Sequence, residues 1–174
     1  RIYMLKGQHL ATVASVNDLG VIRTPGFIST EQCTTVACKA SRAANCIRRS
    51  FSYGSRKLLW PAFQAYVLPT LMFCASSWAP CLLRDIDVIE KVQRRYTKTI
   101  HGLHDLPYDK RLQELGALIL ANRRTYADMT LVFKCLHGMI NCSPSALGLM
   151  VAENSTRSAA HRLIQTRIAN RAHG

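Results

Sequence analysis

The spacing of apolar residues between Cys33 and Phe51 constrains the fold more than any other feature of this sequence. These residues recur at steps of three and four, which places them on one face of an α-helix. The set is Cys33, Val36, Ala37, Ala40, Ala44, Ile47 and Phe51. Ser29 or Thr30 can begin the helix, since a hydroxyl accepts a hydrogen bond from a free N–H of the first turn. We therefore predict a helix with one face in the core and a basic outer face.

Further segments have helical patterns. The clearest is Arg84–Ile100, which carries acidic residues near its start and basic residues near its end, as the helix dipole favours. Arg56–Ser77 is apolar nearly all round, so we expect a deeply buried helix that Pro69 kinks or divides. Tyr108–Leu115 and Leu120–Met139 predict a short and a longer helix.

The front of the chain has the pattern of strands. Ile2–Leu5 and His9–Val13 flank a short turn that contains Gly7, which predicts a β-hairpin. Val16–Ile22 predicts one more strand, and Thr24–Gly26 then breaks the chain.

The length of 174 residues suits one domain with a modest core and a tail. We predict a mainly α fold preceded by a small β element. Three parts are expected: strands in residues 1–28, a helical domain in residues 29–150, and a basic, mobile tail in residues 151–174.

One stretch raises the question of a membrane span. The 26 residues from Leu58 to Leu83 contain no charged side chain, which is long enough to cross a bilayer. Two prolines and several polar residues interrupt the stretch, and these argue against a helix that faces lipid. We expect a buried core helix and no membrane association.

The charge of the chain favours a polyanionic partner. There are 23 Lys and Arg against 10 Asp and Glu, and residues 1–60 alone carry nine basic and two acidic side chains. Nucleic acid is the usual partner of such a surplus. A basic protein with scattered charge is the alternative that composition leaves open.

Cysteine spacing gives no sign of a structural metal site. The chain has seven cysteines and no Cys-x-x-Cys pair, which favours free thiols in a reducing compartment. Cys135, His137 and Cys142 resemble part of a zinc site, but a fourth ligand and the usual spacing are missing.

Short strings follow one another along the chain in a definite order. The most informative are Asp18–Val21, Asp85–Arg95, Leu106–Tyr108 and Leu136–Gly138. Between and after them stand Tyr66–Pro69, Trp78–Pro80, Arg111–Leu112, Leu115–Gly116, Arg123–Arg124, Phe133–Lys134 and His161–Leu163.

This series resembles the C-terminal part of reverse transcriptases of non-LTR (LINE-type) retrotransposons, over nearly the whole chain. The resemblance implies that residues 1–28 are the end of the polymerase palm, with primer-grip strands. It implies that the following helices form a thumb-like bundle that binds the RNA–DNA template–primer duplex. The remainder of the polymerase chain is an implied partner, and the cytoplasm and nucleus are the implied locations.

The catalytic motif of that family is missing. The family uses a Tyr-x-Asp-Asp turn, whose carboxylates hold the metal ions of the polymerase, with Mg²⁺ expected in the full-length enzyme. Tyr126–Met129 resembles the motif, but it has Met at its last position, lies in a helical pattern and follows the Asp18–Val21 string instead of preceding it. We therefore expect no catalytic residue, no metal and no cofactor in this chain, and no polymerase activity from it alone.

Basic residues on the two clearest helices are the candidate contacts to phosphates. They are Lys39, Arg42, Arg48, Arg49, Arg94, Arg95 and Lys98. Solvated helix faces paired with Asp87 and Glu90 are the alternative. Trp60 and Trp78 are expected to pack in the core rather than stack on bases.

Two other functional interpretations stay open. The chain can be a stand-alone helical nucleic-acid-binding protein derived from such an element, or a decayed copy without function. In-frame sequence upstream of Arg1 that encodes the catalytic turn would distinguish a polymerase fragment from either.

Overall fold

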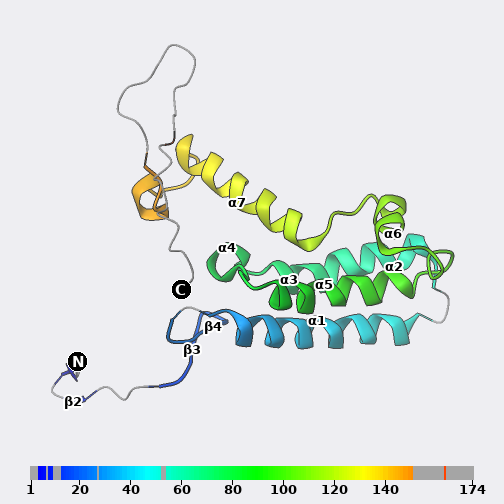
Figure 1. Cartoon of the computed structure of the whole chain (residues 1–174), viewed down its shortest axis with the longest axis horizontal. Helices are drawn as coiled ribbons and strands as arrows, with labels where there is room; N and C mark the ends of the chain where they lie inside the picture. The colour runs from blue at the N-terminus through cyan, green and yellow to red at the C-terminus, as the bar shows by residue number, and fades with distance from the viewer. Residues whose placement is uncertain are drawn as a thin grey trace, which may run out of the picture. The chain divides into compact units, whose positions relative to one another are not determined.

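The computed structural model describes residues 4–6, 8–9, 13–26, 28–51, 54–150 and 163. This part of the chain is mainly helical, as the periodicity predicts, with two short β-hairpins before the helices (Figure 1). The chain forms two compact units, Arg1–Arg124 and Thr125–Gly174. The predicted tail, residues 151–174, lies outside the described residues except for Leu163.

The first hairpin joins β1, Met4–Leu5, to β2, Gln8–His9, in antiparallel register with Met4 opposite His9. It lies where the sequence predicts a hairpin, although the described strands are shorter than expected.

The second hairpin joins β3, Val16–Asp18, to β4, Val21–Arg23. Leu19 and Gly20 form its two-residue tip, with φ of 49° and 87°. Two positive φ values define a type I′ turn, whose twist suits a tight hairpin. The Gly20 N–H donates to Asn17 Oδ1 at 3.0 Å. The prediction of one strand over Val16–Ile22 is therefore wrong, because local turn chemistry folds the segment back on itself.

Helix α1, Thr30–Ser50, buries the predicted apolar face except for Phe51, which caps its end and is 38% exposed. The Ile22 N–H donates to Gln32 Oε1 at 2.9 Å, which ties the second hairpin to this helix. The predicted hydroxyl cap is absent. The Thr30 hydroxyl instead donates to Asp85 Oδ2 at 2.7 Å, and so joins α1 to the start of a later helix.

The segment predicted as one helix over Arg56–Ser77 is divided. It contains α2, Arg56–Ala62, then the π-helical turn η1, Phe63–Val67, then α3, Leu68–Met72, and α4, Ala75–Trp78. Pro69 has no N–H and crowds the carbonyl four residues before it, and a π-helical turn accommodates this defect. The predicted disruption at Pro69 is confirmed.

Complete burial of this segment is not observed. Tyr66 is 70% exposed and Phe73 is 52% exposed, so the segment has a solvent-facing side. No helix among the described residues has the length and apolar character needed to cross a membrane.

The remaining helices follow the predicted ranges closely. They are α5, Leu83–Lys98; α6, Tyr108–Leu115; and α7, Leu120–Leu136. The short 3-10 helix η2, Pro144–Leu147, was not predicted. Gly116 follows α6 with φ of 58°, the left-handed conformation that commonly ends a helix. The helical pattern of α7 groups Tyr126, Met129 and Phe133 with its apolar positions, but all three side chains are more than half exposed.

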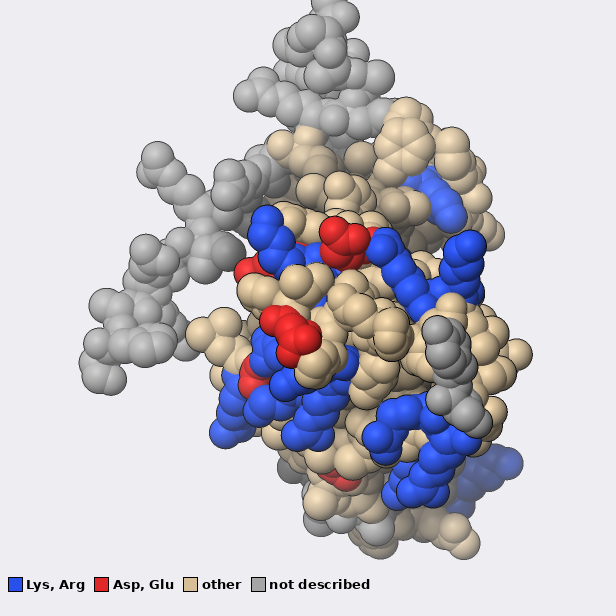
Figure 2. All heavy atoms as spheres, turned by 90° about the vertical axis from the view of Figure 1, so that its right-hand side faces the viewer, with Lys and Arg blue, Asp and Glu red and all other residues tan. Residues whose placement is uncertain are grey.

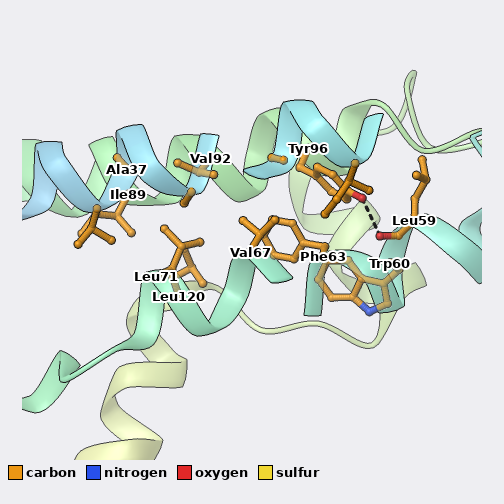
Figure 3. Close-up of a cluster of buried hydrophobic side chains, with 14 of the residues drawn as sticks. Ala37, Leu59, Trp60, Phe63, Val67, Leu71, Ile89, Val92, Tyr96 and Leu120 are labelled. Carbon is orange, nitrogen blue, oxygen red and sulfur yellow. Dashed lines mark hydrogen bonds between the residues drawn. The ribbon is translucent and has the colours of Figure 1, made fainter. Parts of the chain in front are cut away.

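The core of the first unit lies between α1, α5 and the α2–α3 segment (Figure 3). Phe63 stacks on Trp60, with ring centres 5.3 Å apart, and contacts Tyr96 at 4.7 Å. The Tyr96 hydroxyl donates to the Leu59 carbonyl at 2.7 Å. Burial of each such large side chain stabilises the fold by about 1.5–3 kcal/mol. Trp60 and Trp78 are both buried, as expected for core residues.

Candidate nucleic-acid interface

Helices α1 and α5 lie side by side and run in the same direction (Figure 1). The Thr30–Asp85 hydrogen bond joins their N-terminal ends, and Arg48 near the end of α1 lines a cavity together with Thr99 after the end of α5. A parallel pair brings the two C-terminal ends together. Those ends carry basic residues, which are Arg48, Arg49, Arg95 and Lys98.

A groove runs between the two helices. It has two cavities of about 240 and 390 Å³, and both are lined by Ser41, Val92 and Arg95. Ala44, Val92 and Tyr96 contribute apolar and aromatic surface to it. We call this feature the α1–α5 groove.

Basic side chains line the α1–α5 groove from both helices. Arg48 lines the smaller cavity, Arg42 and Lys91 line the larger one, and Arg95 lines both. Among the described residues, no Asp or Glu lines either cavity. The residues that line the groove therefore include four basic side chains and no acidic one, and Lys91 among them is ion-paired with Asp87 at 2.9 Å.

Two uncharged donors supplement the arginines. Ser41 lines both cavities and Asn45 lines the smaller one. Arg48 stands six positions after Arg42, which is about 9 Å along the helix axis. Along the axis of duplex DNA the phosphates of one strand repeat every ~3.4 Å, so the groove is long enough to meet more than one of them.

The structure separates the candidate residues into groups. Arg42, Arg48 and Arg95 share the groove. Arg49 and Lys98 are exposed and lie beside it, since Arg49 is two helical turns after Arg42 and Lys98 is one turn after Arg95. The face where the helices end shows clusters of Lys and Arg with fewer acidic side chains (Figure 2).

Lys39 does not belong to this groove. It lines a separate cavity on another face of α1, together with Gly20, Pro69 and Phe73. The sequence groups Lys39 with the arginines because all of them are off the apolar face. In the structure, Lys39 lies on the side of α1 next to Pro69 and Phe73, whereas the arginines lie on the side next to α5. The two sides can be distinguished only by the helix that packs against each of them, which the sequence of α1 does not contain.

Arg94 has internal partners. Its Nη1 donates to Asp87 Oδ1 at 3.1 Å, and its guanidinium lies 5.2 Å from the centre of the Tyr108 ring. Lys91 Nζ lies 2.9 Å from Asp87 Oδ2. Hydrogen bonds from Lys91 and Arg94 hold the pKa of Asp87 below its usual value. Arg94 is thus half-buried and ion-paired with Asp87, as expected if this face of α5 is paired with acidic residues instead of phosphates. Arg95, its neighbour, lines the groove.

Sequence reasoning did not select Lys91, Ser41 or Asn45. Lys91 stands four residues before Arg95, a spacing that places both on one face of α5. This spacing was the available signal for Lys91. Nothing in the sequence distinguishes Ser41 and Asn45 from other polar residues on α1, because their place depends on how α5 packs.

Residues of α5, α6 and the first turn of α7 form a polar network whose members do not line the groove. The Tyr108 hydroxyl donates to Glu90 Oε1 and accepts a hydrogen bond from Gln93 Nε2 at 3.0 Å. Glu90 Oε2 accepts from the Leu120 N–H at 2.9 Å, and Gln93 donates to the Leu118 carbonyl at 3.0 Å. Glu90 and Gln93 are both buried. The network fixes α5, α6 and the first turn of α7 to one another.

Arg111 completes this arrangement. Its Nη1 donates to the Arg94 carbonyl at 2.9 Å, and its guanidinium lies 5.4 Å from the centre of the Tyr108 ring. Burial and the Glu90 carboxylate raise the pKa of Tyr108, and burial lowers the pKa of Arg111. These residues stabilise the bundle, and they do not line the groove.

Tyr126–Met129 lies within α7, as its helical pattern predicts, and not in a turn between strands. In the described part of the chain, no three His, Cys, Asp or Glu side chains are grouped so that they can hold a metal ion.

Comparisons with known proteins give no assignment for this arrangement. A scan against protein-family models, a search of curated proteins and a search of solved structures each found no match.

Proposed function

We propose that the chain is part of an RNA-directed DNA polymerase of a non-LTR retrotransposon, and that its α1–α5 groove binds the backbone of the RNA–DNA template–primer duplex. The observation that carries the proposal is the meeting of Arg42, Arg48 and Arg95 in one groove whose described lining has no acidic residue. The resemblance indicates the class of protein, and the basic side chains of the groove suit the phosphates of a duplex.

Arginine suits this role because its planar guanidinium donates two parallel hydrogen bonds to phosphate oxygens. Ser41 and Asn45 can add uncharged donors between the arginines. Contacts of this kind hold a duplex in position without reading its bases. The proposed activity is therefore binding without sequence preference, and the remainder of the polymerase would supply catalysis.

The polar network supports the same proposal. Phosphate binding by several side chains requires that the helices carrying them keep a fixed separation. The Thr30–Asp85 hydrogen bond joins α1 to α5, and Glu90, Gln93 and Tyr108 join α5 to α6. In this proposal the network keeps α5 in place while Arg95 contacts the duplex.

The direct test is titration of a fluorescent 20-base-pair RNA–DNA hybrid with the whole chain, followed by anisotropy at several salt concentrations. We expect saturable binding whose affinity falls steeply with salt. Polyglutamate at the same concentration of negative charge is the control. Equal competition by polyglutamate and by unlabelled hybrid would reduce the interaction to general charge attraction and overturn the proposal.

A further inference from the structure

The chain turns back on itself directly after α7, within the second compact unit. Gly138 has φ of 66°, and the Met139 N–H donates to the Lys134 carbonyl at 2.8 Å. The Cys142 N–H then donates to the Ile140 carbonyl at 2.9 Å. These two turns return Cys142 to the last turn of α7, beside Cys135.

The two cysteines contact each other closely. The Cys135 thiol donates to the Cys142 carbonyl oxygen at 3.0 Å. Burial raises the pKa of Cys135, and the neighbouring Cys142 thiol raises it further. Cys135 is buried and Cys142 is half-buried, so an oxidant in solution reaches Cys142 first.

This pair differs from the other cysteines. Cys38, Cys46, Cys74 and Cys81 are exposed, and Cys33 is buried at the start of α1. The Cys135 thiol, by contrast, contacts the backbone of Cys142, so these two residues are neighbours in space, as a disulfide requires.

We propose that Cys135 and Cys142 are a dithiol site that forms a reversible intramolecular disulfide, with a small organic disulfide of the glutathione class as its oxidant. The Cys142 thiolate attacks one sulfur of the small disulfide and releases one small thiol. The Cys135 thiolate then attacks Cys142 Sγ, and the second small thiol leaves. Two protein thiols are oxidised, and one small disulfide is reduced to two thiols.

The bond would close the turn that ends α7. In the reduced chain, non-covalent contacts, including the Met139–Lys134 hydrogen bond, hold this turn at the C-terminal end of the helix. The oxidised chain keeps it covalently, and opening of the helix end then requires reduction. This inference does not depend on nucleic-acid binding, because both cysteines lie outside the α1–α5 groove.

The test uses the whole chain with Cys38, Cys46, Cys74 and Cys81 replaced by Ser, which leaves Cys33, Cys135 and Cys142. After treatment with oxidised glutathione, we expect an intact mass lower by two hydrogens, no glutathione adduct, and a peptide that links Cys135 to Cys142. Dithiothreitol should restore the starting mass. Trypsin cleavage after Lys134 should be several-fold slower in the oxidised form.

Single variants provide the controls. Cys135→Ser should keep one glutathione on Cys142, because no second thiol displaces it, and Cys142→Ser should remain unmodified. Circular dichroism confirms that each variant keeps its helix content. A folded parent that stays reduced, or that keeps a glutathione adduct on Cys142, would overturn the proposal.

Discussion

Arg94 and Arg95 are neighbours in α5, but their side chains have different surroundings. Arg94 is ion-paired with Asp87 at 3.1 Å and lies over Tyr108. Arg95 lines both cavities of the α1–α5 groove. A partner that binds in the groove meets Arg95, whereas Arg94 is already engaged within the protein.

Substitution of the two residues should therefore have unequal effects on binding. Arg95→Gln should reduce the slope of log affinity against log salt by about 0.9, the contribution of one phosphate contact. Arg94→Gln should leave the slope unchanged, so the double variant should lose about one contact. Anisotropy titrations of the hybrid at several salt concentrations measure this. The sequence alone predicts that the double variant loses two contacts. That result would contradict the conclusion that Arg94 is engaged within the protein and does not contact phosphate.

Tyr108 has a structural role in this account. Its hydroxyl bonds both Glu90 and Gln93, and Glu90 is 7% exposed. Removal of the hydroxyl leaves a buried acceptor and a buried donor without this partner. Loss of a buried hydrogen-bond partner costs about 1–3 kcal/mol.

Tyr108→Phe should accordingly lower the free energy of unfolding by about 1–3 kcal/mol, as measured by urea denaturation. Tyr66→Phe is the matched control, because Tyr66 is 70% exposed and should change stability by less than about 0.5 kcal/mol. Equal stabilities of the two variants would contradict the network.

At the scale of single elements, Tyr96 connects α5 to α2. Its hydroxyl donates to the Leu59 carbonyl, and its ring contacts Phe63 (Figure 3). Burial raises the pKa of Tyr96 to about 12. A tyrosine in the unfolded chain ionises near pH ~10. The Tyr96 hydroxyl therefore ionises at a lower pH in the unfolded state than in the folded state.

This difference predicts a loss of stability at alkaline pH. The contribution of neutral Tyr96 is fully present below pH ~10 and is lost as the pH rises from about 10 to about 12. Tyr96→Phe should lower stability by about 1 kcal/mol at pH ~8, and its disadvantage should shrink as the pH rises through this window. Urea midpoints at successive pH values provide the measurement. A disadvantage that is constant across the window would contradict the account.

The helices with one apolar face could be predicted from the sequence. In α1, α5 and α6, apolar residues recur at steps of three and four, and acidic residues stand near the start of each helix. A glycine follows the end of α6. All of these local signals indicate a helix, so they agree with one another. The approximate position of the break in Arg56–Ser77 followed from Pro69, because proline acts locally. These features depend on residues close together in the chain.

Other features depend on contacts that no local pattern contains. The Thr30 hydroxyl bonds Asp85, 55 positions away, instead of capping its own helix. The sequence predicts a strand through the hairpin at Leu19–Gly20, because apolar Leu19 suits a strand pattern, but Leu19 is exposed and its φ is positive. The groove itself was not predicted, because it exists only where α1 packs against α5. Its arginines were found through charge, and Lys39 was grouped with them for the same reason.

For the whole molecule, the distribution of charge matters more than its sum. The chain carries a formal net charge of +13, and any basic protein of this charge attracts nucleic acid to some extent. The central claim is narrower: the α1–α5 groove carries the contacts. A test must therefore compare variants of equal net charge.

The most direct measurement compares two triple variants in the salt dependence of hybrid binding. One is Arg42→Gln, Arg48→Gln, Arg95→Gln, which removes three charges from the groove. The other is Lys39→Gln, Lys57→Gln, Lys110→Gln, which removes three exposed charges outside it. The account predicts that the groove variant loses about 2.7 from the slope of log affinity against log salt, while the control loses little. Equal losses in the two variants would contradict a binding site in the groove.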